Sequence, residues 1–412
     1  MEVVLIHRDR SRDIENNINI SHRIVDDPTL WEIIYDDKNV MTFLKICGFH
    51  FRPDKRDHLF TRVLVKLWLV ILICMGGIGF IWQTFVIGGE AIKNLYDTVK
   101  NDDTTLTDVL IDFGKMLVEF FTHLVQATSL MYSLYHINRQ LDRAVELEMT
   151  SKLLPICKRD AFTFCAIMVL IVITIDPIII NYRGYDAYLD GVSAKTTSYE
   201  IYVMNCLSNM SFNLVATLYL SVVMFFNSLT LKQIQSLQKN LLHGIENNHL
   251  SNDEYMVQKE KIFFLQKQSY GPSKVITVVA GINVLMEMFQ IWHYHYNFEK
   301  YYDQGFTYQE MVLFDLRTLP FLFKGIFFTT STTSLVPNTY TLYFIEIVFF
   351  FYVLWTASAI NKLHDQLRAT IATKCWEANK SSDIKYLQYS AMYQDALEFP
   401  IMFEFGPFKV LK

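Results

Sequence analysis

The chain has 412 residues, of which 51% are hydrophobic and 15% aromatic, while charged residues make up only 19%. An ordinary soluble domain carries about 25% charged residues, and a formal net charge of −5 gives no reason to expect a nucleic-acid partner. Several apolar runs reach the roughly 20 residues that a helix needs to cross a bilayer. The composition therefore predicts an all-α membrane protein with the lipid bilayer as its first partner.

The N-terminal region, 1–62, is polar and mixed in charge, with one amphipathic patch, "MTFLKICGFHF". It predicts a cytoplasmic segment with short helices. The opening apolar stretch, "VVLI", is shorter than the roughly 7–15 residues of a signal peptide. The first spanning helix is therefore expected to serve as the targeting signal.

Residues 63–361 are predicted to form a transmembrane helical bundle that includes cytoplasmic helix extensions. A further apolar stretch, 311–328, carries Asp315, Arg317 and Lys324. Each ionised side chain costs roughly 2.5–3.5 kcal/mol at mid-bilayer, so we expect an interfacial or re-entrant helix in a long outer loop. The six clear spans are predicted at 65–88, 112–135, 161–182, 201–228, 274–298 and 340–361.

Loop charge predicts the orientation, because Lys and Arg collect on the cytoplasmic side. Basic residues gather before the first span, after the second, after the fourth and after the sixth, whereas the loop after the first is acidic. This alternation places the N-terminus and the connection 362–397 inside, in a multi-pass protein of the plasma membrane. A crossing at 311–328 would put that basic connection outside, against the rule.

Three spans, the second, fourth and sixth, continue as amphipathic helices with apolar residues at three- and four-residue steps. Such a stripe buries one face against another helix, and a heptad-like seam also suits subunit association. The alternative is a helix lying on the membrane surface. The residues expected to pack subunits together are Leu231, Ile234, Leu237, Leu241, Ile360, Leu363, Leu367 and Ile371.

The six cysteines show no CxxC spacing typical of a metal site. None lies in a predicted extracellular loop, so we expect no structural disulfide. His293 and His295 are two residues apart, which is poor helical spacing for a shared metal. The sequence therefore predicts neither a metal site nor a cofactor.

The lead-in "FLKICGFHFRPDK", the inside N-terminus and the long cytoplasmic helix extensions resemble the insect gustatory and odorant receptor superfamily, in the form of a divergent or nematode relative. In that family the last helix begins with a loose Pro, Phe, Gly, Phe pattern, which here matches Pro400, Phe403, Gly406 and Phe408. Residues 398–412 are therefore expected to begin a truncated seventh helix of a seven-span bundle. An amphipathic tail lying on the membrane is the alternative.

The resemblance implies a chemosensory receptor subunit of the gustatory-receptor type, a protomer of a tetrameric, ligand-gated cation channel that is not an enzyme. The stimulus is a small molecule or, as for some relatives, light. One alternative is a non-conducting regulatory subunit that assembles with full-length relatives. A G-protein-coupled receptor is a second; it would need an outside N-terminus. A transporter or an intramembrane enzyme is favoured by no motif found.

A ligand pocket is implied in the outer half of the bundle, where polar and aromatic side chains enter the spans. The asparagines at 205, 209 and 213 share one helix face, and their structural alternative is interhelical hydrogen bonding. The pocket candidates are Glu119, His123, Asp176, Tyr182, Asn205, Asn209, Asn213, Glu287, Trp292, Tyr294, Tyr343, Glu346 and Tyr352.

Overall fold

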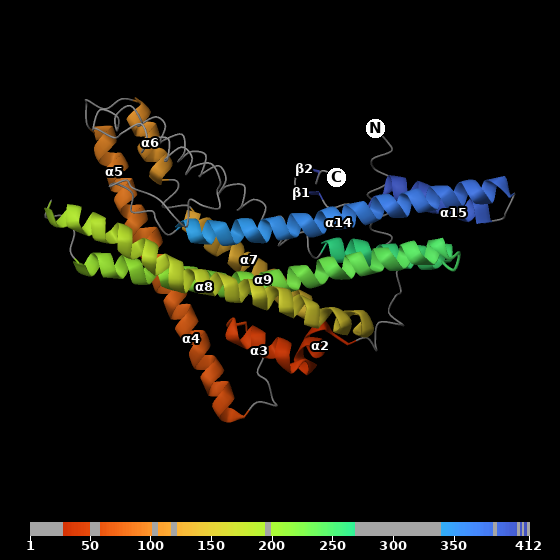
Figure 1. Ribbon diagram of the computed structural model, residues 1–412, viewed down its shortest axis with the longest axis horizontal. Helices are drawn as coiled ribbons and strands as arrows, with labels where there is room; N and C mark the ends of the chain where they lie inside the picture. Colours follow the sequence, from red (N-terminus) through yellow and green to blue (C-terminus); the bar gives the residue numbers. More distant parts are fainter. Residues whose placement is uncertain are drawn as a thin grey trace.

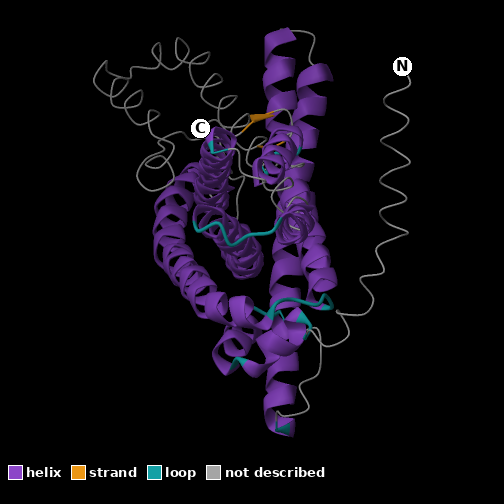
Figure 2. Cartoon of the chain, turned by 90° about the vertical axis from the view of Figure 1, so that its right-hand side faces the viewer, coloured by secondary structure: helices purple, strands orange, loops and turns teal. Residues whose placement is uncertain are grey.

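The computed structural model describes 28–49, 58–100, 106–116, 122–193, 199–267, 339–381, 385–401, 404–405 and 408–409. In these residues the chain is almost entirely helical, apart from two paired strands of two residues each (Figure 2). The predicted all-α architecture is confirmed for this part of the chain. The predicted fifth span, 274–298, and the stretch 311–328 lie outside the described residues.

Three long helices form the body of the molecule: α8 (Leu147–Ser193), α9 (Tyr199–Glu246) and α14 (Thr339–Lys380). Both α8 and α14 pack along α9 (Figure 1). They contain 47, 48 and 42 residues, or roughly 60–70 Å at 1.5 Å per residue. Since a bilayer core is about 30 Å thick, each helix is long enough to cross a membrane and continue well beyond it.

Two of the described helices are long and apolar enough to cross a membrane: α4 (Leu59–Ile81) and the Met210–Glu246 part of α9. The apolar window of α4 is only 11% buried, whereas that of α9 is 89% buried. Leu67, Val70 and Ile73 of α4 are all more than half exposed. An apolar helix with exposed side chains, such as α4, beside a buried central helix, such as α9, is the arrangement expected of a protein in lipid. The full set of spans stays a prediction.

Helix α4 crosses α9 at Gly79. A Cβ atom on Gly79 would lie 2.6 Å from the Ser208 carbonyl oxygen and 2.9 Å from the Phe212 Cβ. Small residues at helix crossings let two backbones approach closely in membranes. The chain then passes through a π-helical turn, η2 (Trp82–Ile87), into α5 (Gly88–Lys100) and α6 (Leu106–Met116).

Two short helices, α2 (Leu30–Asp36) and α3 (Lys38–Ile46), form an N-terminal hairpin. Thr29 and Glu32 form a capping box at the start of α2, the pattern that satisfies the free N–H groups of a first helical turn. The Leu30 amide donates to the Arg143 carbonyl at 2.9 Å, just after α7 (Thr122–Leu141). The short helices expected in this region are therefore present, and they are tied to the bundle.

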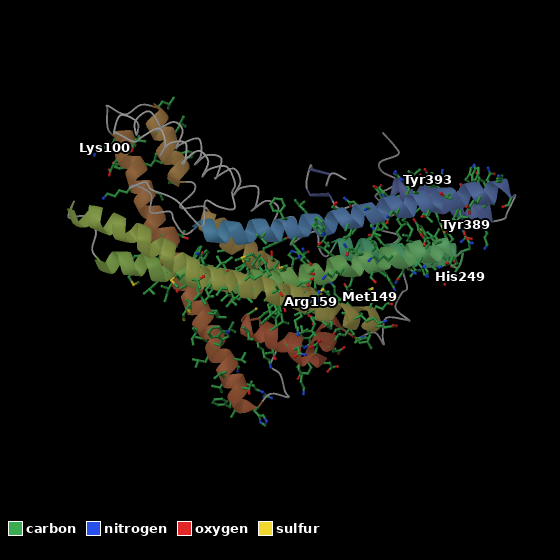
Figure 3. The ribbon with its side chains drawn as sticks, viewed as in Figure 1. Lys100, Met149, Arg159, His249, Tyr389 and Tyr393 are labelled. Atoms are coloured by element: carbon green, nitrogen blue, oxygen red, sulfur yellow. The ribbon has the colours of Figure 1, made fainter. Side chains whose placement is uncertain are left out.

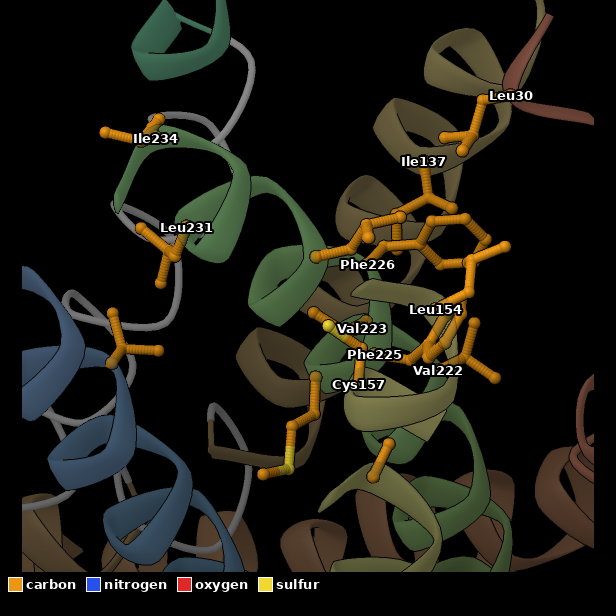
Figure 4. Close-up of a cluster of buried hydrophobic side chains, with 14 of the residues drawn as sticks. Leu30, Ile137, Leu154, Cys157, Val222, Val223, Phe225, Phe226, Leu231 and Ile234 are labelled. Carbon is orange, nitrogen blue, oxygen red and sulfur yellow. The ribbon is translucent and has the colours of Figure 1, made fainter. Parts of the chain in front are cut away.

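The amphipathic patch "MTFLKICGFHF" begins within α3, where Met41, Phe43 and Leu44 are buried in the core. The Phe43 ring lies 6.3 Å from that of Phe162 and 6.1 Å from that of Phe225. Figure 4 shows Ile137 and Leu154 close to Phe226 and Phe225 of α9. The core thus joins α3, α7, α8 and α9.

The apolar stripes that were expected to pack subunits are buried inside one chain, so that prediction is corrected. Leu231, Ile234 and Ile371 are fully buried, as are most of the others, and Leu363 is half-buried. They lie in helices packed along each other, where the Gln238 amide donates to the Ile360 carbonyl at 3.2 Å. The stripes therefore form the α9–α14 contact.

The C-terminal helix α15 (Lys385–Glu398) packs against α14 and the helix at 252–267. Beyond it, β1 (Glu404–Phe405) pairs antiparallel with β2 (Phe408–Lys409). The prediction of a seventh helix beginning at 398–412 is therefore wrong for these four residues, which are extended. The intervening dipeptide Gly406-Pro407 is of a type that favours a turn; the exposed Pro400 precedes the pair, and Phe403 lies outside the described residues.

Candidate functional site

Helix α9 carries a row of polar side chains through its apolar length. Asn213, Thr217, Ser221, Ser228 and Lys232 follow one another at four- and seven-residue steps, which keeps them on one face. The first four are buried and Lys232 is half-buried. We call these five residues the polar stripe. Buried polar groups need partners, and the neighbouring helices supply most of them.

The C-terminal end of the polar stripe contacts two other helices, α8 and α14. The Ser228 hydroxyl lies 2.7 Å from the Tyr352 hydroxyl of α14 and donates to the Cys157 sulfur of α8 at 3.7 Å. One turn further on, the Lys232 ammonium donates to the Asp160 carboxylate at 2.5 Å. We call these five residues the inner polar cluster. It ties α8, α9 and α14 together where the apolar segment of α9 gives way to its amphipathic extension.

The electrostatics of the cluster favour hydrogen bonding over nucleophilic chemistry. Burial raises the pKa of the Cys157 thiol to about 11, although the charge of Lys232 and the Ser228 hydroxyl act in the opposite direction. The thiol therefore stays protonated at neutral pH, and a thiol is a weak nucleophile compared with a thiolate. No group of three or more His, Cys, Asp and Glu side chains in the described part of the chain could hold a metal ion.

The N-terminal part of the polar stripe contains one hydroxyl without a hydrogen-bond partner in the described part of the chain. Ser221 donates to the Thr217 carbonyl at 2.8 Å and also contacts the Cys165 thiol. The Thr217 hydroxyl is buried and has no hydrogen-bond partner among the described residues. An unsatisfied buried hydroxyl costs about 1–3 kcal/mol. The Thr217 hydroxyl can therefore donate a hydrogen bond to, or accept one from, a small molecule or a rearranged neighbouring helix.

Of the predicted pocket residues, the structure describes the side chains of Asn213 and Tyr352, and it does not bring them together. Asn213 lies on the polar stripe, whereas Tyr352 lies in the inner polar cluster, beside the last residue of the predicted fourth span. Ser228 is about 22 Å from Asn213 along the helix at 1.5 Å per residue. The placement of Tyr352 in the outer half is therefore wrong on the predicted topology.

The other candidates are placed only by their backbones or not at all. Asn205 and Asn209 lie on the same face of α9 as Asn213 and continue the polar stripe toward its N-terminal end. His123 lies in α7. Asp176 and Tyr182 lie in α8, and Tyr343 and Glu346 lie in α14. Glu119, Glu287, Trp292 and Tyr294 lie outside the described residues.

Sequence reasoning missed the inner polar cluster. The signal was present in α9, because the four-residue step of the asparagines continues through Thr217 and Ser221. The partners Cys157 and Asp160 stand just before the third predicted span, 71 residues from Ser228 and 72 residues from Lys232, respectively. Only the packing of α8 against α9 brings them together.

Comparison of the chain with protein-family models, with curated proteins and with solved structures finds no match. Function is therefore argued from the residues and their arrangement.

Proposed function

We propose that this chain is a chemosensory receptor subunit of the gustatory-receptor type, a multi-pass protein of the plasma membrane. In this proposal it is a protomer of a ligand-gated cation channel that responds to a small molecule or to light. The support is the resemblance of its layout, two apolar helices long enough for a bilayer, and helices that extend far beyond one.

The observation that carries the proposal is the polar stripe. Ligand sites are mostly apolar cavities with a few polar groups that fix orientation, and polar residues inside membrane helices are functional candidates by default. The stripe runs from the asparagine face to the inner polar cluster, which joins three helices. A ligand bound near Asn213 would therefore act on the same helix that holds α8 and α14.

Assembly with related subunits, as homo- or hetero-tetramers, is part of the proposal. Since the predicted packing stripes are internal, subunit contact must use other surfaces. The helix at 252–267 exposes Met256, Val257 and Phe264, at 40%, 53% and 52%. We expect residues of this kind to contact a neighbouring subunit.

Current recording tests the proposal. Cells expressing the chain, alone or beside a full-length gustatory receptor, are exposed to a panel of sugars, alkaloids and amino acids and to light pulses. The proposal predicts a cation current, with Asn213→Ala shifting the half-activating concentration at least tenfold and the exposed control Asn379→Ala shifting it less than twofold. Surface-expressed protein that gives no current and alters none of the partner's current contradicts it.

A non-conducting regulatory subunit is the second candidate. It is favoured by the β1–β2 pair, which stands where the resemblance implies the start of the last helix. On this alternative the chain gives no current alone but changes the amplitude or the ligand sensitivity of a full-length relative. A current from the chain alone would contradict it.

A further inference from the structure

Two cysteine thiols meet between the N-terminal hairpin and the bundle. Cys47 caps the C-terminal end of α3, and Cys165 lies in α8. Both are buried and both are free thiols. Phe43 and Phe162, about one helical turn before Cys47 and Cys165, place their rings 6.3 Å apart where α3 packs on α8. The two thiols therefore lie at one contact between segments far apart in the sequence, and they interact electrostatically there. Neither residue is used by the inner polar cluster.

The surrounding contacts hold this pair in place. The Trp68 indole donates to the Ile46 carbonyl at 2.9 Å, which fixes the end of α3 against α4. Gly48 has a φ of +74°, and a Cβ there would lie 2.6 Å from the Leu72 side chain. Glycine adopts such a φ without strain. The chain can therefore turn sharply just after Cys47 and keep its thiol against α8.

Exposed residues flank the buried pair on both segments. Ile46, the residue before Cys47, is 50% exposed, and Phe162, one turn before Cys165, is 53% exposed. The thiols themselves are buried, at 0% and 7% exposed. The hydrogen bond with Cys165, together with burial, raises the pKa of the Cys47 thiol. Reaction consequently requires an oxidant that diffuses into the site, or a brief opening of α3.

We propose that Cys47 and Cys165 form a reversible disulfide that clasps the N-terminal hairpin to the bundle. Two S–H bonds break and one S–S bond forms, while two electrons and two protons pass to a diffusible two-electron thiol oxidant. Disulfide geometry requires Cα atoms within about 7 Å, so the proposal requires α3 and α8 to approach each other this closely at Cys47 and Cys165. The clasp restrains α3, which packs on α8 and α9. This inference is independent of the proposed receptor function.

Thiol counting tests the proposal. Every protein carries Cys74→Ser, since Cys74 is exposed on α4 and would otherwise join two chains. The full-length protein is oxidised with diamide, a diazene that takes up both electrons and protons as its hydrazine, and is then denatured and labelled with polyethylene-glycol maleimide. Of the six cysteines, five remain to be labelled in the reduced protein. We expect three labels after diamide and five again after dithiothreitol.

Matched variants assign the pair. Cys47→Ala and Cys165→Ala should each give four labels with or without diamide, while Cys157→Ala, a buried cysteine of the same helix, should fall from four to two. In the folded protein, oxidation should slow amide hydrogen exchange in α3 at least tenfold. Five labels after diamide, or a loss of two labels in Cys47→Ala, overturns the proposal.

Discussion

Lys259 and Asp395 form an ion pair that joins the helix at 252–267 to α15 across 136 residues of sequence. The Lys259 side chain is only 3% exposed, and its ammonium also donates to the Asp395 carbonyl at 2.9 Å. Phe263 and Phe399 place their rings 5.4 and 5.7 Å from the same ammonium. This pair holds α15 at one end of the molecule, near Tyr389 and His249 and far from Lys100 (Figure 3).

Removing one partner of this ion pair should destabilise the protein strongly. Asp395→Ala leaves the Lys259 charge buried without its carboxylate, and breaking a buried pair in this way costs about 3–5 kcal/mol. The double variant Lys259→Met/Asp395→Leu should recover most of that loss, because no charge is left behind. Denaturant unfolding in detergent measures both, with the exposed Lys261→Met as control. Equal losses in the single and double variants would contradict this role.

The α4–α9 crossing predicts opposite outcomes for two neighbouring glycines. Gly79→Ala should destabilise the protein by about 1–3 kcal/mol, since overpacking forces backbone to shift and the new Cβ meets the Ser208 carbonyl. Gly77→Ala should stay within about 0.5 kcal/mol, because nothing lies within 4 Å of its Cβ position. The same unfolding measurement distinguishes them, and a harmless Gly79→Ala would refute the close crossing.

How far the sequence predicts the structure differs between these features. The apolar periodicity at 231–241 and 360–371 correctly indicates helices with one buried face, because three- and four-residue spacing is a local property. It does not reveal which surface covers that face, and here α9 and α14 cover each other. Likewise, the Ser228–Tyr352 contact spans 124 residues and depends on the register between two helices, which no local pattern encodes.

At the C-terminal residues, by contrast, the local sequence predicts the structure better than the family resemblance does. Family resemblance placed a helix start at 398–412, and the local sequence argued otherwise. Gly406-Pro407 lies between Phe405 and Phe408, and a proline lacks the N–H that a helix interior needs. The dipeptide therefore carries a turn signal just before the observed β2 strand.

The inner polar cluster should behave as a coupled unit. Ser228→Ala and Tyr352→Phe each remove one side of the hydroxyl–hydroxyl hydrogen bond, which is worth about 1 kcal/mol net. Residues in contact give non-additive effects, so a double-mutant cycle should show a coupling energy of about 1 kcal/mol. Thr373→Ala, an exposed threonine of α14, is the control and should add independently to Ser228→Ala. Additive losses for Ser228 and Tyr352 would show that the contact does not form.

Acidification should weaken the end of α7 through His136. Burial, together with the charges of Arg139 and Arg143, lowers the pKa of this imidazole from 6.5. The unfolded chain therefore binds more protons between the folded pKa and 6.5, so stability falls as the pH drops through that window. The melting temperature should fall more between pH 7.5 and 5.5 in the wild type than in His136→Gln. Identical falls would contradict this assignment.

The orientation of the bundle is the central claim, and cysteine labelling in intact cells tests it most directly. Lys100, at the end of α5, and Lys380, at the end of α14, are exposed and are predicted to face opposite sides of the membrane. In a Cys74→Ser background, a membrane-impermeant maleimide should label Lys100→Cys in intact cells and Lys380→Cys only after permeabilisation. Labelling of Lys380→Cys in intact cells would contradict the predicted number of spans, and labelling of Lys100→Cys only after permeabilisation would contradict the inside N-terminus and, with it, the receptor-subunit proposal.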